Sequence, residues 1–213
     1  VSAAAPGLRP GQVWAQMSTV GVEAVRRLAA LAGEHGLTFV DAPVQGTRQP
    51  AEQGRLVILG AGPPPAREAL GPVFSALGQR TIWLDEDGGS GAATRLKLAA
   101  VSLGISMTAA IAEALALARG LGLDPGLVRE VVTGGPMDSA YFQAKSQAIM
   151  KGDFEPSFTV RNAEKDTGLI MEAAEQAGVR LDLVAAARDR LRRAGQMGHG
   201  GDDMAATYFA ASD

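Results

Sequence analysis

One long apolar stretch, from Gly91 to Gly122, most constrains what this chain can fold into. It carries no charged residue between Lys97 and Glu113, and its leucines, alanines and methionine are good helix formers. A helix that is apolar on nearly every face is expected to be buried on nearly every face. At roughly fifteen residues, the uncharged run is too short to cross a bilayer, so we interpret it as the core helix of a soluble protein.

Lys97 lies one turn inside the start of this predicted helix. A lysine in such a place must pair with another group, extend its amine toward solvent or carry a lowered pKa. Its position alone favours an amine that extends to solvent. The alternative is a lysine with a chemical role, and the rest of the sequence favours that alternative.

The chain ahead of this helix alternates between strands and helices in the order βαββαβ, up to about Glu86. We predict strands over 13–18, 37–44, 55–62 and 80–86, helices over 22–36 and 63–78, and a polar loop over 45–54. Residues 1–10 are expected to lead into this structure and form little of it.

After the glycine cluster at 88–91, the pattern predicts helices alone. These cover 127–132, 139–151, 162–178 (with Asn162 as the cap) and 181–194, and a last helix follows Asp203. The arginines of 181–194, among them Arg190, are expected on a solvated face. We therefore expect an α/β domain over 1–89 and an all-helical domain over 90–213.

Composition excludes several classes of function. The 213 residues are 46% hydrophobic and 20% charged, as in an ordinary globular protein. A net charge of −3 without a basic stripe argues against a nucleic-acid surface. With no cysteine and only two histidines, a thiolate or histidine metal site is not expected. We see no signal peptide or membrane span, which leaves the cytoplasm as the default location.

Several short motifs occur in one characteristic order: STV at 18–20, DAPVQG at 41–46, GSGAATRLK ending at Lys97, AEAL at 112–115 and EKD at 164–166. In this order the chain resembles the β-hydroxyacid dehydrogenase family, the relatives of 3-hydroxyisobutyrate dehydrogenase and, more distantly, 6-phosphogluconate dehydrogenase. The resemblance covers essentially the whole chain. It implies the C-terminal half of a Rossmann-type doubly wound domain, followed by an all-helical domain built on the long buried helix.

The resemblance assigns chemistry to a few positions. Lys97 matches the family's catalytic lysine, which exchanges a proton with the substrate oxygen while hydride moves to or from nicotinamide. Burial can bring the pKa of such an amine toward neutrality, where it can act as a general acid or base. Gln45, Gly46 and Thr47 fall in the loop that holds the substrate carboxylate, and Val101 lies on the helix face beside the lysine.

The implied cofactor is NAD or NADP. Ser18 and Thr19 match the pair that contacts it, and Lys165 matches a lysine of the helical domain that closes over it. On the residues alone, Thr19 is simply a helix N-cap and Lys165 a surface lysine beside Asp166.

Departures from the family pattern are as informative as the matches. No GxGxxG turn precedes a helix near the N-terminus. Compared with the family pattern, we therefore expect roughly the first third of a dehydrogenase to be absent from this sequence, and the 213 residues alone to be inactive. Gln45 replaces a serine, Thr47 a glycine, and Gln16 an aspartate. Ala100 and Val101 stand where an asparagine usually follows the lysine.

The leading hypothesis is an NAD(P)-dependent oxidoreductase that interconverts a small β-hydroxy acid and its semialdehyde or keto form. Its expected partners are this small molecule and further copies of the chain, as a homodimer or homotetramer, and neither nucleic acid nor a membrane. One alternative is a dehydrogenase-like module kept for assembly or binding without catalysis. Another is an imine-reductase-like enzyme of the same architecture.

Overall fold

The computed structural model describes residues 7–211. The chain forms two compact units, which meet in sequence between Val101 and Ser102. The expected lead over residues 1–10 therefore lies mostly outside the described residues.

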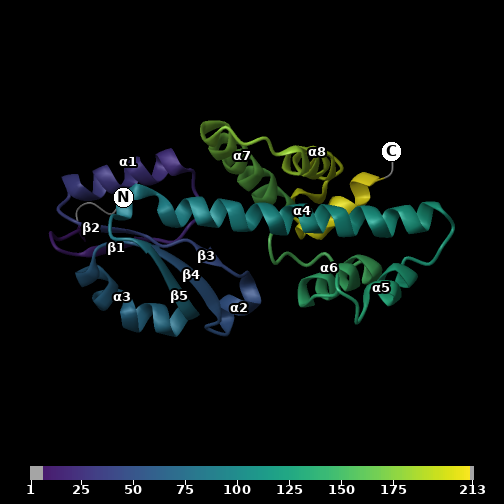
Figure 1. Ribbon diagram of the computed structural model, residues 1–213, viewed down its shortest axis with the longest axis horizontal. Helices are drawn as coiled ribbons and strands as arrows, with labels where there is room; N and C mark the ends of the chain where they lie inside the picture. The colour runs from purple at the N-terminus through teal and green to yellow at the C-terminus, as the bar shows by residue number, and fades with distance from the viewer. Residues whose placement is uncertain (1–6, 212–213) are drawn as a thin grey trace. The chain divides into compact units, whose positions relative to one another are not determined.

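The first unit is an α/β structure whose elements follow the predicted order (Figure 1). Its strands are β1 (Val13–Gln16), β2 (Thr38–Asp41), β3 (Val44–Gln45), β4 (Leu56–Ala61) and β5 (Gly78–Asp85). Its helices are α1 (Val22–Glu34), α2 (Arg48–Glu52), α3 (Pro64–Leu77), the 3-10 turn η2 (Gly88–Ser90) and the first turns of α4 (Ala92–Gly120).

Two helices cover opposite faces of the sheet. Successive side chains of a strand point to opposite faces, and in β2 Phe39 packs with α1 whereas Val40 packs with α3. The α3 side chains Leu70 and Phe74 complete that second core. Figure 1 shows the same layering, with α1 on one side of the strands and α3 on the other.

The sheet is mixed, within the Rossmann-type architecture that the resemblance implies. β1 pairs with β2 in parallel, and β4 with β5, but β2 and β3 both run antiparallel to β4. A parallel crossover needs a dozen or more residues. Only a short link that contains α2 joins β3 to β4, so the chain reverses direction there.

Two predicted boundaries in this region were wrong. The strand expected over 37–44 ends at Asp41, because Pro43 cannot continue a hydrogen-bonded ladder, and the chain re-enters the sheet as β3. The loop expected over 45–54 contains α2. A helix of five residues is too short to show a periodic apolar pattern.

The long helix α4 forms as predicted and spans 29 residues. By length and composition, among the described residues it is the single helix that could cross a membrane, a test that core helices of soluble proteins also pass. Its Leu98, Ile105 and Leu115 are buried. Burial on nearly every face is not achieved within one chain, however, because Leu103 and Leu117 are 63% and 64% exposed.

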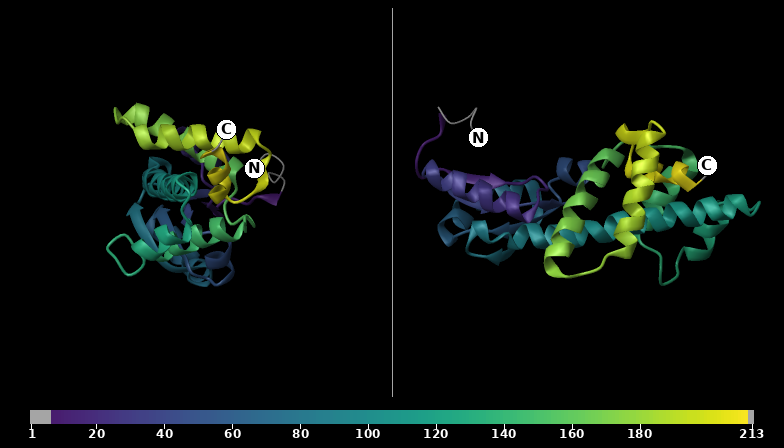
Figure 2. Two further views of the ribbon diagram at one scale, coloured as in Figure 1. Left: turned by 90° about the vertical axis from the view of Figure 1, so that its right-hand side faces the viewer. Right: turned by 90° about the horizontal axis from the view of Figure 1, so that it is seen from above.

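The second unit is helical, as predicted. It contains the rest of α4, α5 (Gly126–Val132), α6 (Ala140–Lys151), α7 (Val160–Ala177), α8 (Asp182–Gln196) and the 3-10 helices η3 (His199–Gly201) and η4 (Met204–Ala211). Ile111, Ala112 and Leu115 of α4 pack against Phe142 and Ile149 of α6 in its core. Figures 1 and 2 show α5 and α6 on one side of α4, and α7 and α8 on the other.

Helix caps were predicted with mixed success. The hydroxyl of Ser139 accepts a hydrogen bond from the Phe142 amide, and α6 ends at Lys151 as expected. The cap of α7 is Thr159 rather than Asn162, whose own amide donates to the Thr159 hydroxyl. Arg190 was wrongly expected on a solvated face, and it is 7% exposed.

Candidate functional site

Lys97 lies in the second turn of α4 and is 8% exposed. Its Nζ donates a hydrogen bond to Oε1 of Gln45 at 3.0 Å. The structure thus brings together two residues that the sequence singled out separately, 52 positions apart. The amine of this buried side chain donates to the oxygen of a neutral amide.

The start of α4 is fixed by two features. Gly91 has a φ of +71°, in the left-handed region that glycine adopts without strain. Three residues later, the backbone N–H and the hydroxyl of Thr94 both donate to the Asp41 carboxylate, at 2.8 and 2.9 Å. Asp41 therefore satisfies one of the backbone donors that a helix N-terminus leaves unpaired.

The segment 41–45, which runs from Asp41 through Gln45, is itself held to the sheet. The Ala42 amide donates to the carbonyl of Gln16, and the Pro43 carbonyl accepts from the Leu59 amide. Gln45 pairs with Val57 in the ladder between β3 and β4. This segment thus gives Lys97 a rigid neighbour.

Burial dominates the electrostatics of Asp41, which is 0% exposed. Desolvation raises the pKa of its carboxyl, while the two hydrogen bonds from Thr94 and the charge of Arg95 act in the opposite direction. Neither Asp41 nor Thr94 was predicted as a site residue from the sequence. The signal that could have identified Asp41 is its position at the end of a buried strand, directly before the predicted substrate loop.

Gly46 and Thr47 connect β3 to α2. Gly46 has a φ of +120°, and a Cβ there would lie 2.8 Å from Cδ2 of Leu56. Backbone conformation and space both require glycine at this position. Thr47 is the N-cap residue of α2, and its side chain makes no capping hydrogen bond.

Ser18 and Thr19 lie in the loop that follows β1. The Gln16 side chain shapes this loop, because its Nε2 donates to the carbonyl of Ser18 at 2.8 Å and its Oε1 faces the Ser18 amide at 3.4 Å. Thr19 does not cap α1, whose N-cap is Gly21. The simpler interpretation of Thr19 from the sequence was therefore wrong.

Two further predicted site residues are placed as follows. Val101 is buried, one turn after Lys97 on α4. Lys165 lies on α7 in the second unit, where its half-exposed side chain contacts Asp166 with Nζ and Oδ1 2.7 Å apart.

Polar groups that the sequence did not highlight form two clusters in the second unit. Lys145 Nζ lies 2.6 Å from Asp203 Oδ1, and the same carboxylate accepts hydrogen bonds from Ser157 and Ala205. Elsewhere, the Tyr141 hydroxyl meets the Thr108 hydroxyl and the Gly104 carbonyl. Burial raises the pKa of Tyr141 to about 12, so its hydroxyl stays protonated at neutral pH.

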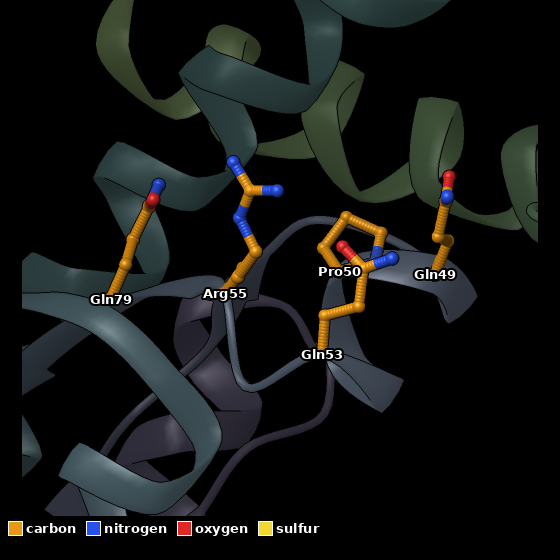
Figure 3. A pocket seen from close by; sticks show the side chains of 5 residues that line it. All are labelled: Gln49, Pro50, Gln53, Arg55 and Gln79. Carbon is orange, nitrogen blue, oxygen red and sulfur yellow. The ribbon is translucent and has the colours of Figure 1, made fainter.

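Two surface hollows are lined by residues other than Lys97. One, of about 310 Å³, is lined by Gln49, Pro50, Gln53, Arg55 and Gln79 (Figure 3). The other, of about 890 Å³, lies in the second unit between α4 and the arginines Arg190 and Arg193 of α8. Among the described residues, no group of three or more histidines or acidic residues could hold a metal ion.

Comparison with known proteins identifies the family. Residues 1–85 match the NAD-binding domain of 6-phosphogluconate dehydrogenase, and residues 91–210 match a domain described as the NAD-binding part of NADP-dependent 3-hydroxyisobutyrate dehydrogenase. The crystal structure of 3-hydroxyisobutyrate dehydrogenase from Salmonella typhimurium superposes with a TM-score of 0.88 at 28% identity, over 96% of this chain and 71% of that one.

Curated relatives include the cytokine-like nuclear factor N-PAC of Xenopus tropicalis and glyoxylate/succinic semialdehyde reductase 1 of Arabidopsis thaliana, each 32% identical. The matches cover 96% and 94% of this chain, but 38% and 68% of the relatives' own lengths. Together with the two family domains, they show that the chain belongs to the NAD(P)-dependent β-hydroxyacid dehydrogenase family, which includes 3-hydroxyisobutyrate dehydrogenase.

Proposed function

We propose that the protein is an NAD(P)-dependent oxidoreductase that interconverts a small β-hydroxy acid and its semialdehyde or keto form, with Lys97 as the general acid and base. The observation that carries the proposal is the buried amine of Lys97, 3.0 Å from the neutral side-chain oxygen of Gln45. A hydrogen bond to a neutral amide oxygen is weaker than one to a carboxylate, so this contact can open when a substrate oxygen approaches the amine. The amine can therefore give a proton to a substrate oxygen and take it back.

Proton transfer runs in both directions of the reaction. During oxidation, the neutral amine of Lys97 accepts the hydroxyl proton of the substrate, and during reduction its ammonium donates a proton to the carbonyl oxygen. NAD or NADP, when bound, would supply or accept the hydride. When the substrate binds, its oxygen either replaces Gln45 as the partner of the amine or binds the amine together with Gln45. In both cases Gln45 lies close enough to contact the substrate.

The substrate carboxylate binds at the turn after β3. Gly46 has a φ of +120°, which other residues adopt only with strain, and backbone amides in such a turn could donate to an anion. The Thr47 hydroxyl, free of a capping bond, adds a donor. Such uncharged donors leave the Lys97 amine available for the proton.

The loop after β1 is in a suitable position to bind a dinucleotide cofactor. Ser18 and Thr19 follow the carboxyl end of β1, which is parallel to β2, and ligands of open α/β sheets bind at the carboxyl ends of parallel strands. Ser18 and Thr19 would contact the cofactor through this loop. By family resemblance, we also assign a cofactor contact to Lys165.

The test is Lys97→Ala in the full-length enzyme, assayed with NAD and NADP on short β-hydroxy acids. We expect kcat to fall by ~10²–10⁴, while cofactor affinity stays nearly unchanged, because a proton-transfer group is lost rather than a binding group. Lys151→Ala, at an exposed lysine that ends α6, is the matched control. Activity of Lys97→Ala within a few-fold of the parent would remove Lys97 from the mechanism.

A second candidate is a dehydrogenase-like module that serves assembly without catalysis. This second candidate is favoured by the similarity to N-PAC, which is named a nuclear factor. The match to N-PAC covers 96% of the present chain. The same assay separates the two candidates: full-length protein that binds NAD or NADP but turns over none of the hydroxy acids or semialdehydes supports the module.

A further inference from the structure

The segment 41–45 contacts α4 at two points, and the proposed reaction uses only one of them. Gln45 contacts Lys97, whereas Asp41 contacts Thr94, one turn earlier on α4. We propose that Asp41 is a positioning residue: by holding Thr94 it fixes the first turns of α4, and with them the place of the Lys97 amine opposite Gln45. This inference rests on the function proposed above.

Asp41 is suited to this task because both of its oxygens bind the same residue. Oδ2 accepts from the backbone N–H of Thr94, and Oδ1 from its hydroxyl. A single hydrogen bond would let the helix pivot about the contact. Two hydrogen bonds to Thr94 fix both the position of the helix along its axis and its rotation about that axis. Both side chains are almost fully buried, at 0% and 1% exposure, so water does not compete for these bonds.

The carboxylate is anchored to the centre of the sheet. In the backbone ladders, Asp41 lies opposite Gln16 of β1 and opposite Ala61 of β4. Movement of Asp41 would therefore disturb two strand pairs at once. Because an error of about 1 Å in the place of a catalytic group can lower a rate ~10²-fold, such an anchor matters for the rate as well as for stability.

Asparagine can reproduce this geometry without the charge. Its carbonyl oxygen can accept from the Thr94 N–H, and its amide can donate to the Thr94 hydroxyl. Alanine makes neither bond. Activity of the asparagine variant therefore distinguishes positioning by hydrogen bonds from an electrostatic effect of the carboxylate on the amine.

The experiment compares Asp41→Asn and Asp41→Ala in the full-length enzyme. We expect Asp41→Ala to lower kcat by ~10–100-fold with KM for the cofactor within about 3-fold, and Asp41→Asn to keep kcat within about 3-fold of the parent. A second readout does not require turnover: the rate at which an acylating reagent labels Lys97 is measured by mass spectrometry across pH. Its profile should shift in Asp41→Ala and stay close to that of the parent in Asp41→Asn.

Asp124 provides the control, because this exposed aspartate accepts a hydrogen bond from the amide of Gly126, the first residue of α5. Asp124→Ala should change neither kcat nor the labelling of Lys97. If Asp41→Ala does not fold, Thr94→Val and Thr94→Ser take its place, and only Thr94→Val, which lacks the hydroxyl, should lower kcat and shift the labelling.

Three results would overturn the proposal: unchanged kcat and labelling in Asp41→Ala, equal losses in Asp41→Asn and Asp41→Ala, or equal behaviour of the two Thr94 variants. Failure of the proposed function has a different signature. Lys97→Ala would then remain active, while a shift of Lys97 labelling in Asp41→Ala would still support the positioning role.

Discussion

Val101 replaces the polar residue that the family usually places one turn after its lysine. It is buried, and on a helix the positions i and i+4 share a face. An asparagine there offers donors and an acceptor to a substrate oxygen, and valine offers none. We infer that the natural substrate is bulkier or less polar near its reacting carbon than 3-hydroxyisobutyrate, with Gln45 supplying part of the missing hydrogen bonding.

The corresponding prediction is that Val101→Asn raises kcat/KM for short, polar hydroxy acids by ~10-fold, since a hydrogen bond to a buried oxygen contributes about 1–3 kcal/mol. Steady-state assays on a panel of hydroxy acids and semialdehydes measure this. Val101→Ala is the control, because it adds space without adding a polar group. If Val101→Asn gains nothing over Val101→Ala on the small substrates, the missing asparagine does not set specificity.

At the residue scale, the sequence could identify single members of the site but not their contacts. Lys97 and Gln45 were both chosen from motifs, yet nothing local predicts that they meet across 52 positions. Asp41 belongs to the motif DAPVQG, but its partner Thr94 lies 53 positions away in the sequence. Such contacts depend on the packing of α4 against the sheet, which a periodic pattern does not specify.

At the scale of elements, the Lys145–Asp203 pair ties α6 to the start of η4. Both side chains are almost buried, at 11% and 5% exposure. Removing one member of a buried ion pair leaves the charge of the other buried without a partner. The loss in stability is typically about 3–5 kcal/mol. We therefore expect Asp203→Asn to lower the free energy of unfolding by about that amount in urea denaturation, and adding Lys145→Met to restore part of the loss.

Asp189→Asn is the matched control, because Asp189 pairs with Arg192 on the exposed face of α8. It should change the free energy of unfolding by less than about 1 kcal/mol. A similar effect of the two aspartate substitutions would show that burial of the Lys145–Asp203 pair does not determine its contribution.

The same pair predicts a pH dependence. Burial alone would raise the pKa of Asp203, but the Lys145 charge and the hydrogen bonds from Lys145, Ala205 and Ser157 outweigh it and lower that pKa. A carboxyl with a lowered pKa in the folded state stabilises the fold above its ordinary pKa. This contribution is lost as the pH falls from that ordinary value through the lowered one. Asp203→Asn should flatten the acid limb of a plot of stability against pH, which denaturation at several acidic pH values can measure.

Long elements with a periodic apolar pattern were predicted well. Short elements and polar side chains that are buried were not. The positions of α3, α4 and β4 could be predicted from the spacing of their apolar residues and from the glycine and proline residues that flank them. α2 was missed because it has five residues. Arg190 looked like a surface arginine, but it bonds Glu113 of α4 and the Thr207 carbonyl, partners that no local pattern specifies.

At the scale of the whole molecule, the order of an α/β part and a helical part was predictable because the hydrophobic period changes along the chain. The mixed pairing of the sheet was not, since it depends on how the chain reverses between β3 and β4. The apolar residues at the end of α4 are exposed within one chain. A helix pattern shows that a face is apolar, but not whether that face is covered by the same chain or by another.

Apolar side chains remain exposed where α4 ends and α5 follows: Leu117, Leu121 and Val131 are 64%, 67% and 82% exposed. Large exposed apolar surface marks an interaction site, and by family resemblance we expect a second copy of the chain to cover it, in a homodimer or homotetramer. The combined variant Leu121→Glu and Val131→Glu should therefore shift full-length protein toward monomer in sedimentation velocity, because charges would be buried at the contact. Leu183→Glu, at a residue 75% exposed on α8, should leave the distribution unchanged. A parent protein that is already monomeric, or a combined variant with the parent's mass, would exclude this surface as the contact between copies.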